Sequence, residues 1–141
     1  KSFRQFLDKS PDYPPALLGL LKAVLMQARI CEASDMQEAF PASREFAASE
    51  ALRPLIDALG YAQKAPAYSD DPLEAAYLNA LRLVLRGNPA AAIDGMLDIL
   101  RQDKHYRSGE VRRVVLALFE TLGDDNPLTP PYRHELSSIL F

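Results

Sequence analysis

The sequence predicts an all-α fold, a solenoid of helix-turn-helix units in which about seven or eight helices stack as an α-α superhelix. Apolar residues recur three and four positions apart, which is the spacing of one helix face. No long stretch alternates apolar and polar residues as a strand would, and Val111, Val114 and Val115 also lie at helical spacing. A helix-turn-helix unit of about 34 residues recurs, with Ala33 and Ala92 in the same register.

The first element is predicted over residues 1–13, as the second helix of a truncated repeat. Its apolar positions are Phe3, Phe6 and Leu7. Pro11 lies where such a unit places its terminal proline. Because the first helix of this repeat is missing, and the chain begins at Lys1 rather than Met, we expect the sequence to be cut from a longer one.

The next unit is predicted over residues 14–40, from the alignment of Ala33 with Ala92. Its helices are expected over 16–26 and 30–40. In both units the small residue lets the two helices approach closely.

Residues 41–72 are predicted to hold an extra helix and a linker. The helix is expected over 44–59, with Ser43 as its N-cap and Gly60 as its stop. Pro54 should kink or split this helix, because proline removes a backbone donor and clashes with the preceding turn.

The clearest unit spans residues 73–106. Its helices are predicted over 73–86 and 90–102, joined by the turn Gly87-Asn88-Pro89. Asp70 or Asp71 should cap the first helix, with Pro72 in its first turn, where a missing N–H costs nothing. The buried face of the second helix is predicted at Ala92, Ile93, Met96, Leu97 and Leu100. This order and length are typical of the tetratricopeptide repeat, or TPR.

Residues 107–141 are predicted to close the domain with a helical hairpin, whose helices span 109–122 and 130–141. In the last helix, an inward stripe is expected at Tyr132, Leu136, Ile139 and Leu140. Arg133 and Phe141 then lie nearer the outside, and we interpret them as a candidate partner site. The alternative is that Phe141 folds back and caps the hairpin. All five segments together have the length of one domain.

A second candidate site is the concave groove that the first helices of TPR units line. The predicted lining residues are Leu18, Lys22, Leu25 and Met26 in one unit and Tyr77, Leu81, Val84 and Leu85 in the other. They are mostly apolar, so the groove either binds an apolar helix or extended chain, or is filled by the extra helix over 44–59. A basic clamp for a chaperone tail is disfavoured, since only Lys22 and Asn79 could contribute.

The charge and the cysteine content of the sequence limit its expected partners and its expected location in the cell. With 16 Lys+Arg against 19 Asp+Glu the net charge is −3, which disfavours nucleic acid as a partner. The basic stretch over 101–113 is interpreted as a solvated corner, with a phosphate or partner site as the alternative. The single Cys31, predicted to be a buried thiol, forms no internal disulfide and favours a cytoplasmic location. No apolar run is long enough to suggest a membrane span.

No catalytic or metal-binding pattern is found. His105 and His134 are far apart in the sequence, and no cysteine pair could complete a zinc site with them. The six glycines are isolated and form no phosphate-binding or nucleophile motif. The sequence therefore predicts a protein that is not an enzyme and uses no cofactor.

The last 70 or so residues resemble the end of a family of bacterial thioredoxin-like co-chaperones, the chaperedoxins. The residues that carry the resemblance are Asp103, Gly109, the run LFETLG over 118–123, Pro127-Leu128, Tyr132-Arg133, Leu136 and Leu140-Phe141. Upstream, the segment FPASREFAASEALRPLIDAL lies where those proteins carry a linker helix.

The resemblance implies a TPR module that binds unfolded client proteins, docks on a chaperonin, or does both. In that family a thioredoxin-like domain precedes the TPR units, and its redox motif is absent from this sequence. The alternative is a structural or assembly scaffold whose groove is filled internally. Neither hypothesis involves nucleic acid or a membrane.

Overall fold

The computed structural model describes residues 14–66, 68–123 and 125–141. The predicted helix over 1–13 lies outside these residues. Throughout the described part, the regular structure is helical and contains no strand, so the all-α prediction is confirmed. The elements are α2 (Pro14–Met26), α3 (Ile30–Glu38), α4 (Phe46–Ala51), α5 (Arg53–Lys64), α6 (Pro72–Leu85), α7 (Pro89–Gln102), the 3-10 helix η1 (Tyr106–Gly109), α8 (Glu110–Leu122) and α9 (Thr129–Leu140).

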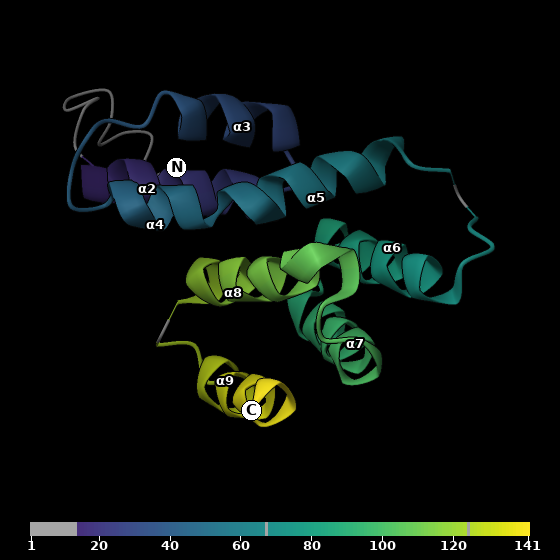
Figure 1. The fold of residues 1–141 in the computed structure, drawn as a ribbon. Coiled ribbons are helices and arrows are strands. Elements are labelled where there is room, and N and C mark those ends of the chain that lie inside the picture. Colours follow the sequence, from purple (N-terminus) through teal and green to yellow (C-terminus); the bar gives the residue numbers. More distant parts are fainter. Residues whose placement is uncertain (1–13, 67, 124) are drawn as a thin grey trace.

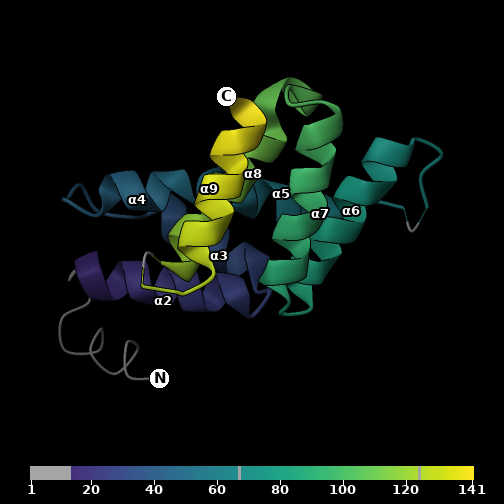
Figure 2. The same ribbon diagram turned by 90° about the horizontal axis from the view of Figure 1, so that it is seen from below.

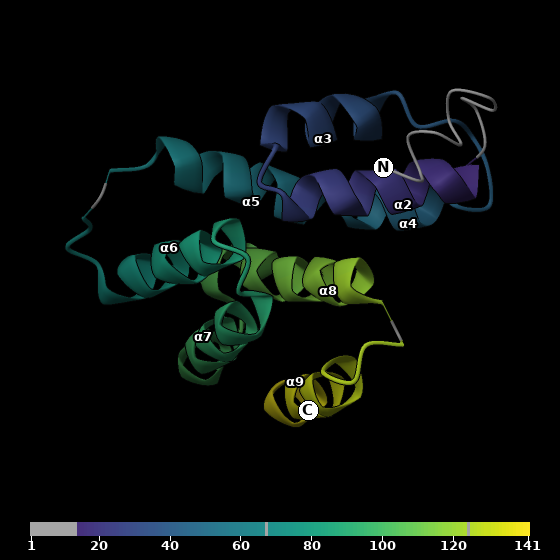
Figure 3. The same cartoon turned by 180° about the vertical axis from the view of Figure 1, so that it is seen from behind.

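The helices form two layers (Figure 1), one built from α2 to α5 and the other from α6 to α9. The view from behind shows the same division (Figure 3). Helix α5 joins the layers, because it packs against α3 on one side and against α6 and α8 on the other. A single apolar core, which includes Leu59, Leu81 and Leu118, runs through both layers.

The α6–α7 hairpin has the ends that the sequence predicts. The Asp71 side chain accepts a hydrogen bond from the Leu73 N–H at 3.1 Å, and the Asn88 side chain accepts one from the Ala91 N–H at 3.4 Å. In the turn, Gly87 has a φ of +83°, a left-handed conformation that glycine adopts without steric cost. The buried face of α7 is confirmed, since its predicted side chains are at most 1% exposed.

The extra helix differs from the prediction in three ways. It is two helices that meet at Leu52, because Pro54 fits only within the first turn of a new helix. Ser43 is not its N-cap; the Ser43 hydroxyl instead donates to the Pro41 carbonyl at 3.1 Å. Gly60 does not stop it, because α5 continues to Lys64 with its apolar face packed in the core.

In helix α3 Ala33 is fully buried, as Ala92 is in α7. The prediction of a buried thiol at Cys31 is wrong, because that side chain is exposed. The buried residues of α3 are Ile30, Ala33 and Gln37, three and four positions apart, so the following residue, Cys31, points away from the core.

The last hairpin is reached through an unusual corner. Three residues in a row, Arg107, Ser108 and Gly109, have left-handed backbones with φ of 55°, 58° and 84°. The predicted inward stripe of α9 is confirmed, with Leu136 buried and its neighbours packed against the core. Phe141 is 100% exposed, so it does not fold back onto the hairpin.

Candidate functional site

The predicted groove residues are divided between the core and its edge. Leu25, Tyr77, Leu81 and Val84 are at most 1% exposed, and they belong to the core shared with α5 and α8. These four side chains offer no surface to a partner in this structure. The remaining lining residues are half-buried, namely Leu18, Lys22, Met26 and Leu85. Lys22 reaches across to α8, where its Nζ lies 3.0 Å from a carboxylate oxygen of Glu120.

A polar cluster occupies the place where α5, α6 and the η1 corner meet. We define the Arg107 cluster as Tyr61, Glu74, Tyr77, Tyr106, Arg107 and Glu110. The Arg107 guanidinium donates to Glu74 at 2.9 Å and to Glu110 at 3.2 Å. The same guanidinium lies over the rings of Tyr61 and Tyr77, at 5.1 and 5.3 Å from their centroids. Both carboxylates and both rings therefore stabilise one cation.

The tyrosine hydroxyls complete the cluster. Tyr77 donates to Glu110 at 2.5 Å, Tyr61 donates to Glu74, and Tyr106 donates to Glu74 at 3.4 Å. The rings of Tyr77 and Tyr106 meet edge to face, with centroids 6.4 Å apart. Each carboxylate thus accepts hydrogen bonds from the arginine and from at least one phenol.

The contacts within the Arg107 cluster shift the pKa values of its tyrosine and arginine side chains. Burial, followed by the hydrogen bond to Glu110, raises the pKa of Tyr77 far above its ordinary value. The pKa of Tyr61 is raised by its hydrogen bond to Glu74. For Arg107, burial lowers the pKa, but the carboxylates Glu110 and Glu74 outweigh burial and leave that pKa raised. The phenols therefore stay neutral and the guanidinium charged at physiological pH.

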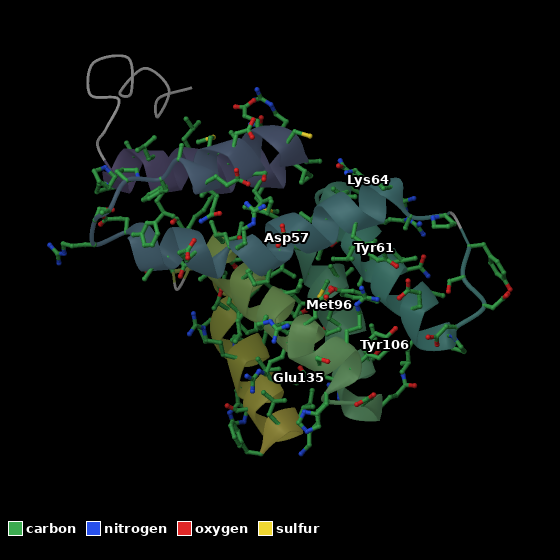
Figure 4. The ribbon with its side chains drawn as sticks, turned by 45° about the horizontal axis from the view of Figure 1, so that its top comes forward. Asp57, Tyr61, Lys64, Met96, Tyr106 and Glu135 are labelled. Carbon is green, nitrogen blue, oxygen red and sulfur yellow. The ribbon has the colours of Figure 1, made fainter. Side chains whose placement is uncertain are left out.

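A cleft opens beside this cluster, between α4 and α5 on one side and α8 on the other. Its volume is about 460 Å³. The α5–α8 cleft is lined by Glu50, Arg53, Pro54, Asp57, Ala58, Tyr61, Arg107, Glu110 and Arg113. Asp57 and Tyr61 follow each other along α5 one helical turn apart (Figure 4). Most charged side chains of the α5–α8 cleft form ion pairs with each other, since Arg53 lies 3.1 Å from Asp57 and Arg107 is paired with Glu110.

The comparison with protein families matches this architecture. A family described as Tetratricopeptide repeat matches residues 46–141, from the start of α4 to the end of α9. This match covers more than half of the chain. The chain belongs to the tetratricopeptide repeat family. Neither a curated protein nor a solved structure matched the chain.

TPR domains are typically non-catalytic modules for protein–protein interaction. In a TPR array the first helices of the units line a concave groove, and here the corresponding face of α6 is covered by the chain's own helices. The surface left for a partner of this TPR domain therefore consists of its clefts and of exposed side chains.

Two exposed side chains of α9 were predicted to contact a partner. Arg133 is exposed, and its guanidinium lies 5.6 Å from the centroid of the Phe119 ring. Phe141 is exposed at the other end of the helix. The histidines His105 and His134 are both exposed, on separate elements. No group of His, Cys, Asp and Glu in the described part of the chain could hold a metal ion, and no helix there is long and apolar enough to cross a membrane.

Sequence reasoning missed the Arg107 cluster. Its members come from four elements, α5, α6, η1 and α8, which lie in three separate segments of the sequence. One signal was available: Glu74 and Arg107 are 33 positions apart, about one repeat length, so a TPR register brings them to similar heights in neighbouring units.

Proposed function

We propose that this TPR domain is a protein-binding module of a thioredoxin-like co-chaperone, which holds unfolded client proteins and docks on a chaperonin. The observation that carries the proposal is a set of large apolar side chains left on the surface of a TPR fold. The exposed members are Phe46, Tyr61, Tyr68, Leu116, Leu128 and Phe141. A cytoplasmic location accords with this role.

The chemistry of these side chains suits weak binding of unfolded chains. Aromatic rings bury a large area on contact and have few rotatable bonds to immobilise. Tyr68 is 78% exposed and Phe141 is 100% exposed, so both gain most of that area from a partner. An unfolded client exposes apolar residues, which would cover these rings on contact.

Client holding can be tested by light scattering. A chemically denatured model protein is diluted into buffer with and without the TPR domain, and aggregation is followed over time. We expect the wild-type domain to reduce scattering, and the variant Phe46→Ser/Leu116→Ser/Phe141→Ser to reduce it much less. The matched control replaces exposed polar residues instead, as Gln63→Ser/Asp98→Ser/Gln102→Ser. Equal activity of the two triple variants would contradict the proposal.

Chaperonin docking needs a separate test with purified chaperonin immobilised on a surface. Deletion of Phe141 alone should lower retention of the TPR domain while changing its melting temperature only slightly, because this side chain is fully exposed. Unchanged retention would leave the α5–α8 cleft as the better docking surface. A domain that neither retains chaperonin nor suppresses aggregation would contradict the whole proposal.

A second function is favoured by a different observation. Tyr77 and Leu81 are fully buried, so the concave face is filled as a structural scaffold requires. Such a scaffold would join subunits or hold an upstream domain. It predicts no binding in either assay above, and a measurable affinity for a separately produced upstream domain.

A further inference from the structure

We propose that a basic cleft at the η1 corner binds an acidic segment of a partner protein. We define the corner cleft as Lys104, His105, Ser108, Gly109, Arg112, Arg113, Leu140 and Phe141. Its volume is about 490 Å³. Figure 2 shows the turn between α7 and α8 beside the C-terminal end of α9. Residues of both segments line the cleft. It is a different surface from the concave groove lined by α2 and α6.

The charged side chains that line the corner cleft all have the same sign of charge. Lys104, Arg112 and Arg113 contribute three permanent cations, His105 adds an imidazole, and none of the carboxylate side chains that the structure describes lines the cleft. The whole chain, in contrast, has a net charge of −3. This local excess of positive charge would attract a segment rich in aspartate or glutamate.

The cations of the corner cleft are also unneutralised. Among the described residues, Lys104, Arg112 and Arg113 form no ion pair. Their neighbour Arg101 is paired with Asp98 and Glu135, and Arg107 is paired with Glu74 and Glu110. The contrast matters because carboxylates of a partner would meet cations that form no ion pair with the described carboxylates.

The loop beneath these cations is held in one conformation. Arg107 and Ser108 adopt left-handed backbones, which non-glycine residues rarely do without support. The ion pairs of Arg107 with Glu74 and Glu110 supply that support. Arg113 in turn donates to the Ser108 carbonyl at 3.3 Å, which positions its guanidinium over the loop. A loop fixed in advance loses less entropy when a ligand binds.

The corner cleft also has an apolar edge, which indicates a second property of the partner segment. Leu140 is half-buried and Phe141 is fully exposed at the side of the corner cleft. A segment that suits this surface therefore carries an aromatic or aliphatic residue beside its carboxylates. Nucleic acid fits less well, because it needs a longer basic surface than three cations on an acidic domain provide.

The inference rests on the proposed function only in that the partner is a protein, and it is tested with a peptide alone. The probe is a fluorescein-labelled peptide of alternating Glu and Asp with one central Phe, titrated with the TPR domain by fluorescence anisotropy. The test variant is Lys104→Gln/Arg112→Gln/Arg113→Gln. Its matched control is Lys64→Gln/Arg44→Gln/Arg86→Gln, which removes the same charges from exposed positions outside the cleft. Circular dichroism verifies that both variants fold.

We expect the dissociation constant to rise roughly tenfold or more in the cleft variant and less than about twofold in the control. A peptide in which Lys replaces the acids should not bind. Equal weakening in both triple variants would overturn the inference, because it would show unspecific attraction to a charged surface. Tighter binding of a single-stranded RNA of equal charge than of the peptide would also overturn it, as would no binding by the wild type.

The two proposals can fail separately. The cleft variant keeps Phe46 and Leu116, so its suppression of client aggregation should match that of the wild type. Peptide binding without any client holding would leave the corner cleft established and the co-chaperone role rejected. Client holding without peptide binding would give the opposite result.

Discussion

The α6–α7 hairpin and the α4–α5 segment differ in how their helices begin. Both helices of the hairpin have a side-chain cap, from Asp71 and Asn88, followed directly by a proline. In α4–α5 neither helix has a side-chain cap, and the two meet at Leu52 without a turn. Yet α5 is as firmly buried, with Leu55 and Leu59 fully inaccessible. Local signals define the hairpin, whereas packing against α3, α6 and α8 defines α5.

A TPR domain can therefore be specified at two levels. The hairpin has enough information in its own sequence to set its limits to within a residue or two. The α4–α5 segment takes its form from the layers on both sides of it. Substitutions at caps should therefore affect the hairpin, and substitutions in the core should affect α5.

The largest effect is expected from Leu59→Ala in α5. This side chain is fully buried, so its truncation should lower the free energy of unfolding by about 2–5 kcal/mol. Chemical denaturation with urea measures the loss. The control is Leu116→Ala on α8, where the side chain is 47% exposed and the loss should be much smaller. A small effect at Leu59 would mean that packing does not hold α5 in place.

The link between the hairpin and the η1 corner can be tested with Tyr77→Phe. Loss of the hydrogen bond to the charged Glu110 should cost about 1.5–3 kcal/mol at neutral pH. The raised pKa of Tyr77 adds a pH dependence. An unfolded tyrosine loses its proton near pH 10, whereas folded Tyr77 retains it, so stability is fully present below pH 10 and falls as the pH rises.

That fall amounts to about 1.4 kcal/mol per pH unit for one retained proton. Tyr77→Phe should therefore have a shallower loss of stability between about pH 10 and 12 than the wild type. Denaturant titrations at several pH values measure the slope. Tyr68→Phe is the control, because Tyr68 is 78% exposed. Identical slopes for the wild type and Tyr77→Phe would contradict the expected proton retention.

The caps provide the most direct test of the comparison. Asp71→Ala should cost about 0.5–2 kcal/mol, because it removes the acceptor of the Leu73 N–H at the start of α6. Glu45→Ala, at the corresponding position before α4, should cost little, since Glu45 makes no capping hydrogen bond. Thermal unfolding of both variants measures the difference. If the two losses are equal, the capping distinction between the regions is wrong.

The smallest effects are expected at two glycines. Gly87→Ala should destabilise the protein by about 1 kcal/mol, because Gly87 has a φ of +83° in the hairpin turn. Gly60→Ala should stabilise it by about 0.5–1 kcal/mol, because Gly60 lies inside α5. The added methyl group there would lie 3.7 Å from Ile30 Cγ2, an ordinary contact. Changes of the same sign in both melting temperatures would contradict this contrast.

The fold was predictable wherever neighbouring residues decide it. Asp71 with Pro72, and Asn88 with Pro89, mark helix starts by hydrogen bonding and fixed φ, and both are readable from sequence. Gly60 was misread because an isolated glycine resembles a helix stop. Only the burial of Leu59 and Ala62 around it explains why the helix continues.

The candidate sites were predictable only in part. For Phe141 the sequence left two positions open, outside the hairpin or folded back onto it, and the structure has this side chain exposed. The Arg107 cluster was not predictable, because its contacts join residues as far apart in the sequence as Tyr61 and Arg107. No local sequence feature indicates that Arg107 and Ser108 adopt left-handed backbones. In the run from Arg107 to Gly109, only the glycine favours that conformation.

The position of α5 on α6 and α8 has a consequence for repeat-protein engineering. If peptide-binding residues were grafted onto the inner face of α6, the peptide would compete with α5 of the same chain for that face. Because α5 ends at Lys64 and α6 begins at Pro72, the connection is short. A segment tethered so closely has an effective concentration on the order of millimolar. A free peptide making the same contacts would displace α5 only above that concentration, so a graft on this scaffold should use another surface.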